Sequence, residues 1–404
     1  MHSVVIIGAS HAATEAIATL RKLGWTDKII LIGDEPHLPY HRPPLSKAFL
    51  KGDLSADKLL IRPESFYQKH DVELHLGRRA VEIDRPANRV VLDNGEQLDY
   101  QYLILATGTR ARKLPVDGAD SERIHYLRTL QDVEVIQAKL TEGTKMLIVG
   151  AGYIGLEVAA SALQLGCQVT VLEAMERVLA RVTSETVSEF YQQVHRNAGV
   201  DLRLNASVTG FTHQPDNSQA ELGDGSKLEF DIALVGIGVV ANTELAAGAS
   251  LVCDNGIVVN EHAQTNDPHI YAVGDCSYHH NPFYNRHLRL ESVPNAVEQA
   301  KTAASSICGQ AIVYDQLPWF WSDQYDLKLQ TAGLFDGFDQ VVVRGDQATR
   351  KFSVFYLQDG HVIAVDAINS PADFMLGKKL ILSRATPDTD DLSNQEVPLK
   401  SLLV

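Results

Sequence analysis

Short apolar runs recur along the chain, and two of them lead directly into turns that contain glycine. Residues 4–7 precede the turn Gly8-Ala9-Ser10-His11-Ala12-Ala13, and residues 146–149 precede the turn Gly150-Ala151-Gly152-Tyr153-Ile154-Gly155. Each run predicts a buried parallel strand, and the spaced apolar positions after each turn predict an amphipathic helix. The pattern therefore predicts two strand–turn–helix units in one chain of 404 residues.

A glycine-rich turn between a strand and a helix is typical of dinucleotide binding. The glycines allow a tight turn, and the helix N-terminus points free N–H groups at a pyrophosphate. The second turn has all three glycines, whereas Ser10 and Ala13 replace the second and third glycines of the first turn. Two such units imply two dinucleotides, and a protein that holds both is expected to pass electrons between them.

In the second unit, a carboxylate follows the next predicted strand, at residues 168–172. Glu173 comes 18 residues after Gly155, a spacing that suits hydrogen bonding to a ribose diol. A carboxylate there accepts the 2′-hydroxyl of NADH and repels the 2′-phosphate of NADPH. We therefore expect NADH, with Arg177 as the nearby cation that counts against this expectation.

In the first unit, the strand predicted at residues 28–32 is followed by Gly33, Asp34 and Glu35. Either carboxylate could bind the ribose of the first dinucleotide, and the spacing favours Asp34.

The alternation of strands and helices continues through the rest of the chain. Further strands are predicted at residues 102–106, around Leu202 and Leu222, at 232–238 and at 269–276. The last of these ends with Asp275 and Cys276, and we expect it to return to the first unit. A linker is expected at residues 110–118.

From about Leu317 the composition changes, and shorter alternating segments predict a small α+β domain. Its expected strands and helix lie at residues 340–344, 352–356 and 372–383. The polar and acidic segment 386–394 is expected to be loose.

Together these elements predict an α/β protein with two Rossmann-type dinucleotide-binding domains and a small α+β C-terminal domain. The expected boundaries are 1–112 with 243–316 for the discontinuous first domain, 113–242 for the second and 317–404 for the third.

The charge of the chain limits its partners. The formal net charge of −15 argues against nucleic acid and anionic membranes as general partners, since both require a basic face. No apolar stretch reaches the roughly 18 residues of a membrane span. The first strand begins close to Met1, which leaves no room for a leader peptide, so we expect a cytoplasmic protein.

The four cysteines, Cys167, Cys253, Cys276 and Cys308, are scattered without a C-x-x-C pair. We interpret them as reduced thiols that behave as small apolar residues.

Several longer stretches make the family recognisable. They are Arg42-Pro43-Pro44-Leu45-Ser46-Lys47, residues 105–108, 152–157 and 271–276, Glu291-Ser292-Val293-Pro294-Asn295-Ala296 and residues 318–324. Through them the chain resembles the FAD-dependent ferredoxin reductases of bacterial cytochrome P450 and Rieske oxygenase systems. The resemblance implies a glutathione-reductase-like fold with FAD in the first domain, NADH in the second and a C-terminal domain that helps to receive a [2Fe–2S] ferredoxin. It implies a hydride transfer from NADH to FAD, followed by single-electron transfers to the ferredoxin that feeds the oxygenase.

The resemblance also implies the site residues. The FAD set is Gly8, Ala12, Asp34, Lys47, Ala80, Arg128, Asp275 and Val293, and the NADH set is Gly150, Gly152, Gly155, Glu157 and Glu173. Lys47 and Glu157 are the expected catalytic residues. Lys47 is expected near flavin N5, where it would stabilise the reduced anionic flavin, and Glu157 near the nicotinamide, on the first turn of its helix, where the helix dipole favours an anion.

The reasons for three other assignments are structural. Asp275, at a strand end, could accept hydrogen bonds from ribityl hydroxyls, although a turn or N-cap role is the ordinary interpretation of such an aspartate. Val293 is expected to act through its backbone N–H, in a segment that Pro294 biases toward an extended form. Trp321 is kept as a cofactor-contact hypothesis, against the ordinary core interpretation of alternating aromatic residues.

The expected partner is an acidic ferredoxin on a local basic patch, with the protein as a monomer. The candidates for this patch are Arg62, Lys301, Lys328, Lys378 and Lys379. Taken singly, each is ordinarily interpreted as a solvated surface charge, whereas together they would steer an acidic ferredoxin. The chain shows no metal-ligand cluster and no catalytic triad.

Three alternatives remain at this stage. The acceptor could be a rubredoxin. A flavin NADH oxidase or disulfide reductase would need a cysteine within residues 37–47, where none occurs. A flavoprotein with mainly an interaction role, such as apoptosis-inducing factor, would be expected to carry extra targeting or basic segments.

Overall fold

In the computed structural model, which describes residues 3–214 and 217–403, the chain folds into two compact units. The first comprises Met1–His41, Asp57–Arg110 and Val239–Pro318, and the second comprises Arg42–Ala56, Ala111–Gly238 and Trp319–Val404. The segment Arg42–Ala56 thus groups with the second unit, although the sequence places it within the first predicted domain. The domain boundaries given above stay a prediction.

The main sheet of the first unit is parallel throughout. Its strands follow the order β19 (Ile270–Ala272), β7 (Tyr102–Leu105), β1 (Ser3–Ile7), β2 (Lys28–Gly33) and β3 (Val72–Leu76). The pairing of β19 with β7 confirms that the segment around residue 270 returns to the first unit.

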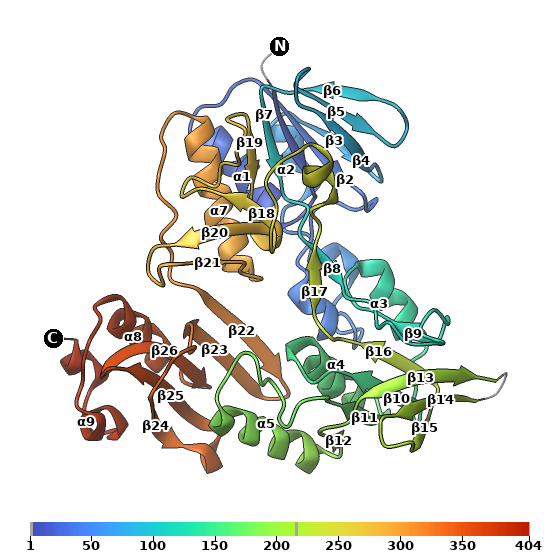
Figure 1. The fold of residues 1–404 in the computed structure, drawn as a ribbon, viewed down its shortest axis with the longest axis vertical. Helices are drawn as coiled ribbons and strands as arrows, with labels where there is room; N and C mark the ends of the chain where they lie inside the picture. Colours follow the sequence, from blue (N-terminus) through green and yellow to red (C-terminus); the bar gives the residue numbers. More distant parts are fainter. Residues whose placement is uncertain (1–2, 215–216, 404) are drawn as a thin grey trace. The chain divides into compact units, whose positions relative to one another are not determined.

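Alternate residues of β1 face different layers. Val4 and Ile6 pack against α1 (His11–Lys22) and α7 (Val293–Ile307), which lie side by side on one face of the sheet (Figure 1). Val5 and Ile7 pack against an antiparallel layer formed by β4 (Ala80–Asp84), β5 (Arg89–Leu92) and β6 (Gln97–Asp99). Burial on both faces explains why the strand is a continuous apolar run.

Shorter elements complete the first unit. They are η2 (Ala56–Leu59), α2 (Glu64–Lys69), β8 (Thr109–Ala111), β17 (Val239–Ala241), α6 (Glu244–Gly248), β18 (Ile257–Val259), η3 (Gly274–Cys276), β20 (Ser277–Asn281) and β21 (Arg286–Leu288).

The second unit holds another parallel sheet. Its strands follow the order β12 (Asp201–Arg203), β11 (Gln168–Leu172), β10 (Lys145–Val149), β16 (Ile232–Val235) and β9 (Ile124–His125). Leu147 and Val149 pack against an antiparallel layer of β13 (Val208–His213), β14 (Ser218–Leu222) and β15 (Lys227–Phe230). The helices α4 (Tyr153–Gln164) and α5 (Glu185–Ala198) pack along the parallel strands, and the unit also contains η1 (Pro43–Ser46) and α3 (Leu130–Gln137).

The C-terminal part of the second unit is an antiparallel sheet. Its order is β22 (Trp319–Gln324), β23 (Leu327–Gly333), β26 (His361–Ile368), β25 (Lys351–Gln358) and β24 (Gln340–Asp346), and α8 (Pro371–Leu382) packs against β23 and β26. The strands predicted at 340–344 and 352–356 and the helix predicted at 372–383 are therefore confirmed. The short η4 (Gln347–Thr349) and η5 (Leu399–Leu402) complete this part.

The prediction of a loose segment at 386–394 is wrong. Asp388 caps a short helix, α9 (Thr389–Ser393), and Leu392 is fully buried. The buried Arg344 donates hydrogen bonds to the carbonyl oxygens of Leu392 (3.1 Å), Asn394 (2.6 Å), Gln395 (3.3 Å) and Val397 (2.9 Å). An acidic composition did not reveal this order, because the side chain that fixes the segment lies about fifty residues earlier.

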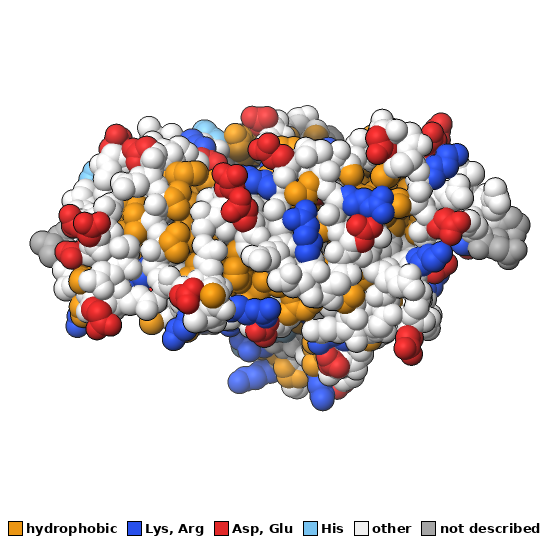
Figure 2. Space-filling view, turned by 90° about the horizontal axis from the view of Figure 1, so that it is seen from below, with side chains coloured by type: hydrophobic (Ala, Val, Ile, Leu, Met, Phe, Trp, Pro, Cys, Tyr) orange, Lys and Arg blue, Asp and Glu red, His pale blue; other side chains and the backbone are white. Residues whose placement is uncertain are grey.

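Among the described residues, every helix is too short or too polar to span a bilayer. On the face drawn in Figure 2, acidic and basic side chains are interspersed, with apolar side chains visible between them.

Candidate functional site

The first glycine turn has the geometry that dinucleotide binding requires. Gly8 has a φ of +111°, and a Cβ there would lie 2.1 Å from the carbonyl oxygen of Ala106. Ser10 precedes α1 in an extended conformation, no described side chain caps this helix N-terminus, and its first turn holds no carboxylate. The backbone N–H groups at the start of α1 can therefore receive a phosphate, so the turn fits the pyrophosphate of a dinucleotide.

The glycines of the second turn have three separate roles. A Cβ on Gly150 would lie 2.5 Å from the carbonyl oxygen of Gly236, and a Cβ on Gly155 would lie 2.0 Å from that of Gly150. Gly152 instead faces open space, with no described atom within 4 Å of a Cβ built there. As in the first turn, no described side chain caps α4. The turn thus combines tight chain reversal, close helix packing and an open approach for a phosphate.

Glu173 lies directly after β11, half-buried at the carboxyl edge of the parallel sheet. Its Oε2 accepts a hydrogen bond from the backbone N–H of Ala151 (2.7 Å), and its Oε1 accepts one from that of Met175 (2.9 Å). The carboxylate is thus held next to the glycine turn, where a ribose diol is expected.

Arg177 is the cation that counts against NADH in the sequence, but its guanidinium is already hydrogen-bonded within its own region of the chain. Its guanidinium donates hydrogen bonds to the carbonyl oxygens of Thr183 (2.8 Å) and Ala180 (2.9 Å) and to Oγ of Ser188 (2.6 Å). These bonds hold the loop between β11 and α5, so Arg177 is not presented to a 2′-phosphate.

In the first unit, Asp34 is exposed after β2, whereas Glu35 is half-buried and accepts a hydrogen bond from Tyr40 Oη (2.6 Å). The choice between them as ribose ligand stays a prediction.

Lys47 and Glu157 form a close ion pair within the second unit. Lys47 Nζ lies 2.6 Å from Oε2 of Glu157, whose side chain is only 2% exposed. Ser46 donates a hydrogen bond to the same oxygen (2.5 Å), and Ser322 donates one to Oε1 (2.6 Å). Lys47 directly follows η1, whose first two residues are Pro43 and Pro44. The prolines therefore fix the approach of Lys47, as the sequence suggested.

The reason given for Glu157 is wrong. Helix α4 begins at Tyr153, so Glu157 lies on its second turn and the first turn holds no acid. The helix dipole acts mainly within the first turn. The carboxylate is held instead by one ammonium group and two hydroxyl groups, which come from segments distant in sequence.

Asp275 and Val293 lie in different secondary-structure elements from those that the sequence predicts. Asp275 lies in η3, beyond the end of β19, because Gly274 turns the chain with a φ of +76°. Thr109 Oγ1 donates a hydrogen bond to its carboxylate (3.4 Å). Val293 is not extended but is the first residue of α7, since proline is well accepted in a first helical turn. The extended residue is Ser292, which caps the helix.

Gln299 is a residue of this region that sequence reasoning missed. Its buried Oε1 accepts hydrogen bonds from the N–H of Gly274 (2.8 Å), from Ser277 Oγ (2.7 Å) and from Asn295 Nδ2 (3.3 Å). It thus ties η3, which carries Asp275, to α7, which carries Val293. The available signal was the spacing of Asn295 and Gln299, two amides one turn apart on the predicted helix.

The other predicted FAD contacts are less defined. Ala12 is buried at the start of α1, and Ala80 is the first residue of β4. Arg128 precedes α3 in the second unit, where its carbonyl oxygen accepts a hydrogen bond from Arg42 (2.7 Å) and its N–H donates one to Asp132 (3.0 Å). The structure thus places Gly8, Ala12, Asp34, Ala80, Asp275 and Val293 in the first unit and every other predicted cofactor residue in the second.

Trp321 and Trp319 are half-buried on β22, with ring centroids 5.7 Å apart. Their partial burial decides neither the core interpretation nor the cofactor interpretation of Trp321. Its contact with a cofactor stays a hypothesis.

All four cysteines are free, and burial raises the pKa of each thiol. Among the described residues, no pair of thiols is therefore prepared for disulfide chemistry. The described part of the chain also holds no group of three His, Cys, Asp or Glu side chains that could bind a metal.

The basic candidates are spread over both units. Arg62 and Lys301 belong to the first unit, and Lys301 is paired with Glu298 (2.7 Å). Lys328 is exposed on β23, and Lys378 and Lys379 are neighbours on α8. The Nζ of Lys378 lies 5.3 Å from the centroid of the Trp319 ring.

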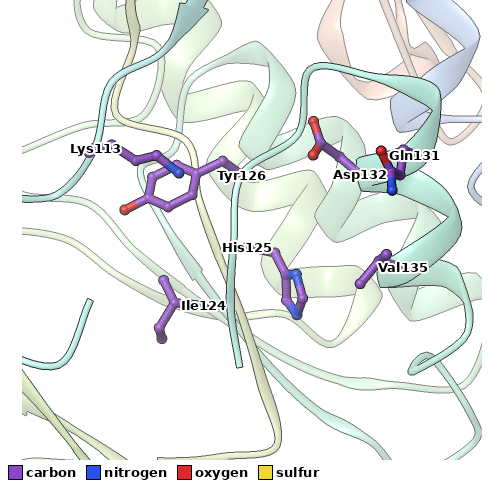
Figure 3. A pocket seen from close by; sticks show the side chains of 7 residues that line it. All are labelled: Lys113, Ile124, His125, Tyr126, Gln131, Asp132 and Val135. Atoms are coloured by element: carbon purple, nitrogen blue, oxygen red, sulfur yellow. The ribbon is translucent and has the colours of Figure 1, made fainter. Parts of the chain in front are cut away.

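Two surface pockets contain none of the predicted site residues. The first, of about 300 Å³, lies beside β9 and the start of α3 (Figure 3), where Lys113 Nζ lies 3.7 Å from the centroid of the Tyr126 ring. Asp132 also lines it, but its carboxylate caps α3 by accepting the N–H groups of Arg128 and Thr129. The second, of about 530 Å³, lies around Trp25 and Lys69 in the first unit.

The chain is similar to known proteins over nearly all of its length. Residues 2–300 match the family model described as pyridine nucleotide-disulphide oxidoreductase, and residues 319–403 match the model described as reductase C-terminal. Putidaredoxin reductase CamA of Pseudomonas putida is 44% identical over 407 residues, which cover 99% of this chain and 96% of that protein. A ferredoxin–NAD(P)+ reductase of Sphingomonas sp. is 40% identical, with 100% and 98% of the two chains covered.

Among solved structures, the covalent putidaredoxin reductase–putidaredoxin complex matches with a TM-score of 0.96 and 44% identity. The match covers 100% of this chain and 98% of the reductase chain. This chain therefore belongs to the pyridine nucleotide-disulphide oxidoreductase family, among its putidaredoxin reductase-like ferredoxin reductases, and that membership implies FAD and NAD(H) as its cofactors.

Proposed function

We propose that this protein is an FAD-containing NADH:ferredoxin oxidoreductase that supplies electrons to a cytochrome P450 or Rieske oxygenase through a [2Fe–2S] ferredoxin. The observation that carries the proposal is the duplicated glycine turn, one in each unit, each leading to a helix N-terminus that no described side chain caps. Two dinucleotide sites in one chain suit an enzyme that moves electrons from one dinucleotide to the other.

When bound, FAD would supply the chemistry of hydride transfer from NADH and of single-electron delivery, and the protein would supply binding, orientation and charge. Gly8, Ala12, Asp34, Ala80, Asp275 and Val293 are the proposed FAD residues of the first unit, and Lys47 and Arg128 complete that set. Gly150, Gly152, Gly155, Glu157 and Glu173 are proposed to hold NADH, and Trp321 is proposed to contact a cofactor. Lys47 and Glu157 are the proposed catalytic pair.

NADH is proposed as the reductant in preference to NADPH. Glu173 places a carboxylate where the 2′-position of the adenosine ribose is expected, and a 2′-phosphate there would be repelled. The engaged state of Arg177 supports this choice, because its guanidinium is already hydrogen-bonded within its own loop.

The partner is proposed to be an acidic ferredoxin that docks on a local basic patch. The related putidaredoxin reductase is known in complex with its ferredoxin, putidaredoxin, which supports a partner of this class. Lys328, Lys378 and Lys379 are the proposed patch residues of the second unit, and Arg62 and Lys301 those of the first. We propose further that the protein acts as a monomer in the cytoplasm, where its four free thiols would stay reduced.

The experiment that tests this function is anaerobic NADH-driven reduction of cytochrome c, with and without a panel of [2Fe–2S] ferredoxins and rubredoxins. A rate that depends steeply on one [2Fe–2S] protein is the expected result. Dependence on a rubredoxin alone would replace the proposed acceptor. Rapid flavin reduction by NADH without gain from any carrier, together with oxygen consumption in air, would favour a flavin NADH oxidase instead.

A further inference from the structure

A continuous chain of hydrogen bonds leads from the C-terminal sheet to the carboxylate of Glu157, entirely within the second unit. Ser322, on β22, is fully buried and donates its hydroxyl to Oε1 of Glu157 (2.6 Å). Gln324, two residues further on the same strand, donates its amide N–H to Oγ of Ser322 (3.2 Å). Since the amide donates to Ser322, the Ser322 hydrogen is free to point at Glu157.

The chain continues into α5 through His195. The buried His195 ring places Nε2 2.9 Å from Oε1 of Gln324 and Nδ1 3.1 Å from Oη of Tyr325. Burial lowers the pKa of His195 to about 4, so the ring is neutral near pH 7. A neutral ring that meets a carbonyl oxygen at Nε2 must carry its hydrogen there, which leaves Nδ1 to accept the hydrogen of Tyr325.

Every donor in this chain therefore points toward the same carboxylate. Tyr325 donates to His195, His195 to Gln324, Gln324 to Ser322 and Ser322 to Glu157, and aligned hydrogen bonds of this kind strengthen one another. On its other oxygen, Glu157 accepts from Ser46 and pairs with Lys47. The buried carboxylate is thus held from both sides, and its position fixes that of the Lys47 ammonium.

We propose that Ser322 is a positioning residue for the Lys47–Glu157 pair, oriented by Gln324 and His195. The first strand of the C-terminal sheet would then set the geometry of the charge pair that serves hydride transfer. This inference rests on the proposed function, in which Lys47 stabilises the reduced anionic flavin. It assigns to the C-terminal sheet a role in the reductive half-reaction, in addition to receiving the electron acceptor.

The test compares Ser322→Ala with Ser353→Ala. Ser353, on β25 of the same sheet, is also fully buried and also donates its hydroxyl to a carboxylate, that of Asp373 (3.0 Å), which lies outside the proposed site. Both purified FAD-loaded proteins are mixed anaerobically with NADH in a stopped-flow instrument, and the flavin midpoint potential is measured by equilibrium titration with a reference dye.

Ser322→Ala should lower the limiting rate of flavin reduction roughly tenfold, as expected for a lost hydrogen bond to a charged group, while the Kd for NADH stays close to that of the unchanged protein. The midpoint potential should fall, because a displaced Lys47 stabilises the reduced anion less. Ser353→Ala should change neither quantity. Gln324→Met should act in the same direction as Ser322→Ala but more weakly, since it removes only the group that orients Ser322.

A Lys47→Met arm separates the inference from the proposed function. Slow reduction in Lys47→Met together with an unchanged rate and potential in Ser322→Ala would overturn the positioning role and leave the proposed function intact. Unchanged behaviour of Lys47→Met would overturn both the role of the pair and the inference. If Ser322→Ala fails to retain FAD, Gln324→Met, which keeps the Ser322 hydroxyl but removes the amide that orients it, tests the inference: an unchanged rate and potential there would overturn it.

Discussion

Three carboxylates in the second unit show how surroundings assign different roles to one functional group. Glu157 is held by an ammonium group and two hydroxyl groups, and Glu173 is held by two backbone N–H groups beside a glycine turn. Asp366, on β26, accepts hydrogen bonds from Thr183 and from Tyr356 (2.6 Å) and is fully enclosed. Sequence reasoning identified the first two from their motifs. Asp366 lies within the apolar run 362–368, but the sequence does not indicate which groups hold its carboxylate.

The first prediction concerns Glu173. Glu173→Ala should raise KM for NADH about tenfold and narrow the preference for NADH over NADPH, because a charged hydrogen-bond acceptor and the repulsion of a 2′-phosphate are both lost. Steady-state kinetics with both nucleotides would measure this. Glu176→Ala, which removes an exposed carboxylate from the same loop, is the control. An unchanged nucleotide preference in Glu173→Ala would show that Glu173 is not the ribose ligand.

The second prediction concerns the pH dependence of stability. Burial raises the pKa of Asp366 from 3.8 to about 6, so the folded protein binds a proton more tightly than the unfolded chain between these values. The protonated Asp366 therefore adds to the free energy of unfolding at acid pH. This contribution, at most about 3 kcal/mol, is lost as the pH rises from 3.8 to about 6 and beyond.

Asp366→Asn should remove this pH dependence, as measured by urea denaturation between pH 4 and pH 7. Asp359→Asn, at an exposed position, should retain it. Equal pH dependence in Asp366→Asn and the unchanged protein would contradict the assignment.

At the scale of elements, the strands were the most predictable part of the molecule. The predicted segment 168–172 coincides with β11, and 28–32 lies within β2. Both could be predicted because a strand that is buried on both faces has a nearly continuous apolar sequence. The turns were less predictable. The positions of Asp275, Val293 and Glu157 relative to their elements depend on a glycine φ, a serine cap and the first residue of a helix, details that hydrophobic periodicity does not specify.

The same reason explains which parts of the candidate site could be foreseen. The glycine turns and their acidic partners are local patterns, so the sequence predicts them directly. The hydroxyls of Ser46 and Ser322 on Glu157 come from segments more than a hundred residues away. The contacts that order α9 span an interval of about fifty residues. Such long-range contacts leave no periodic signal.

The third prediction tests the ordering of α9. Arg344→Met should lower the free energy of unfolding by about 2 to 4 kcal/mol, because several carbonyl oxygens lose a buried charged donor. It should also expose residues 388–397 to limited proteolysis. Arg350→Met removes an ion pair with Asp326 whose side chains are 44% and 63% exposed, so its effect should be below about 1 kcal/mol. Equal effects of the two substitutions would mean that Arg344 does not hold this segment.

At the scale of the whole molecule, charge is the feature that bears most on the proposed partner. A net charge of −15 repels an acidic ferredoxin at long range, so docking requires a local basic patch strong enough to overcome that repulsion. Added salt should lower the rate of electron transfer to the ferredoxin if attraction to the patch dominates, and raise that rate if net repulsion dominates.

The fourth prediction follows from this balance. The rate with an acidic [2Fe–2S] ferredoxin should fall at least about fivefold as salt is raised, because screening weakens attraction to the patch. Lys328→Glu combined with Lys379→Glu should reduce that rate and leave flavin reduction by NADH unchanged. Lys22→Glu combined with Lys227→Glu, at exposed positions on α1 and β15, is the charge-matched control. A rate that rises with salt would mean that net repulsion governs the encounter and that the patch is wrongly placed.

The chain passes between its two units five times, at residues 41/42, 56/57, 110/111, 238/239 and 318/319. The first unit receives β19 and α7 only after the sheet and first helices of the second unit have been translated, so its core cannot close early during synthesis. At roughly 5–20 residues per second, the apolar face of β1 would wait on the order of tens of seconds for α7 to emerge from the ribosome. This order of appearance leaves an apolar sheet face uncovered on the nascent chain, and it means that neither unit can be produced by cutting the gene at a single place.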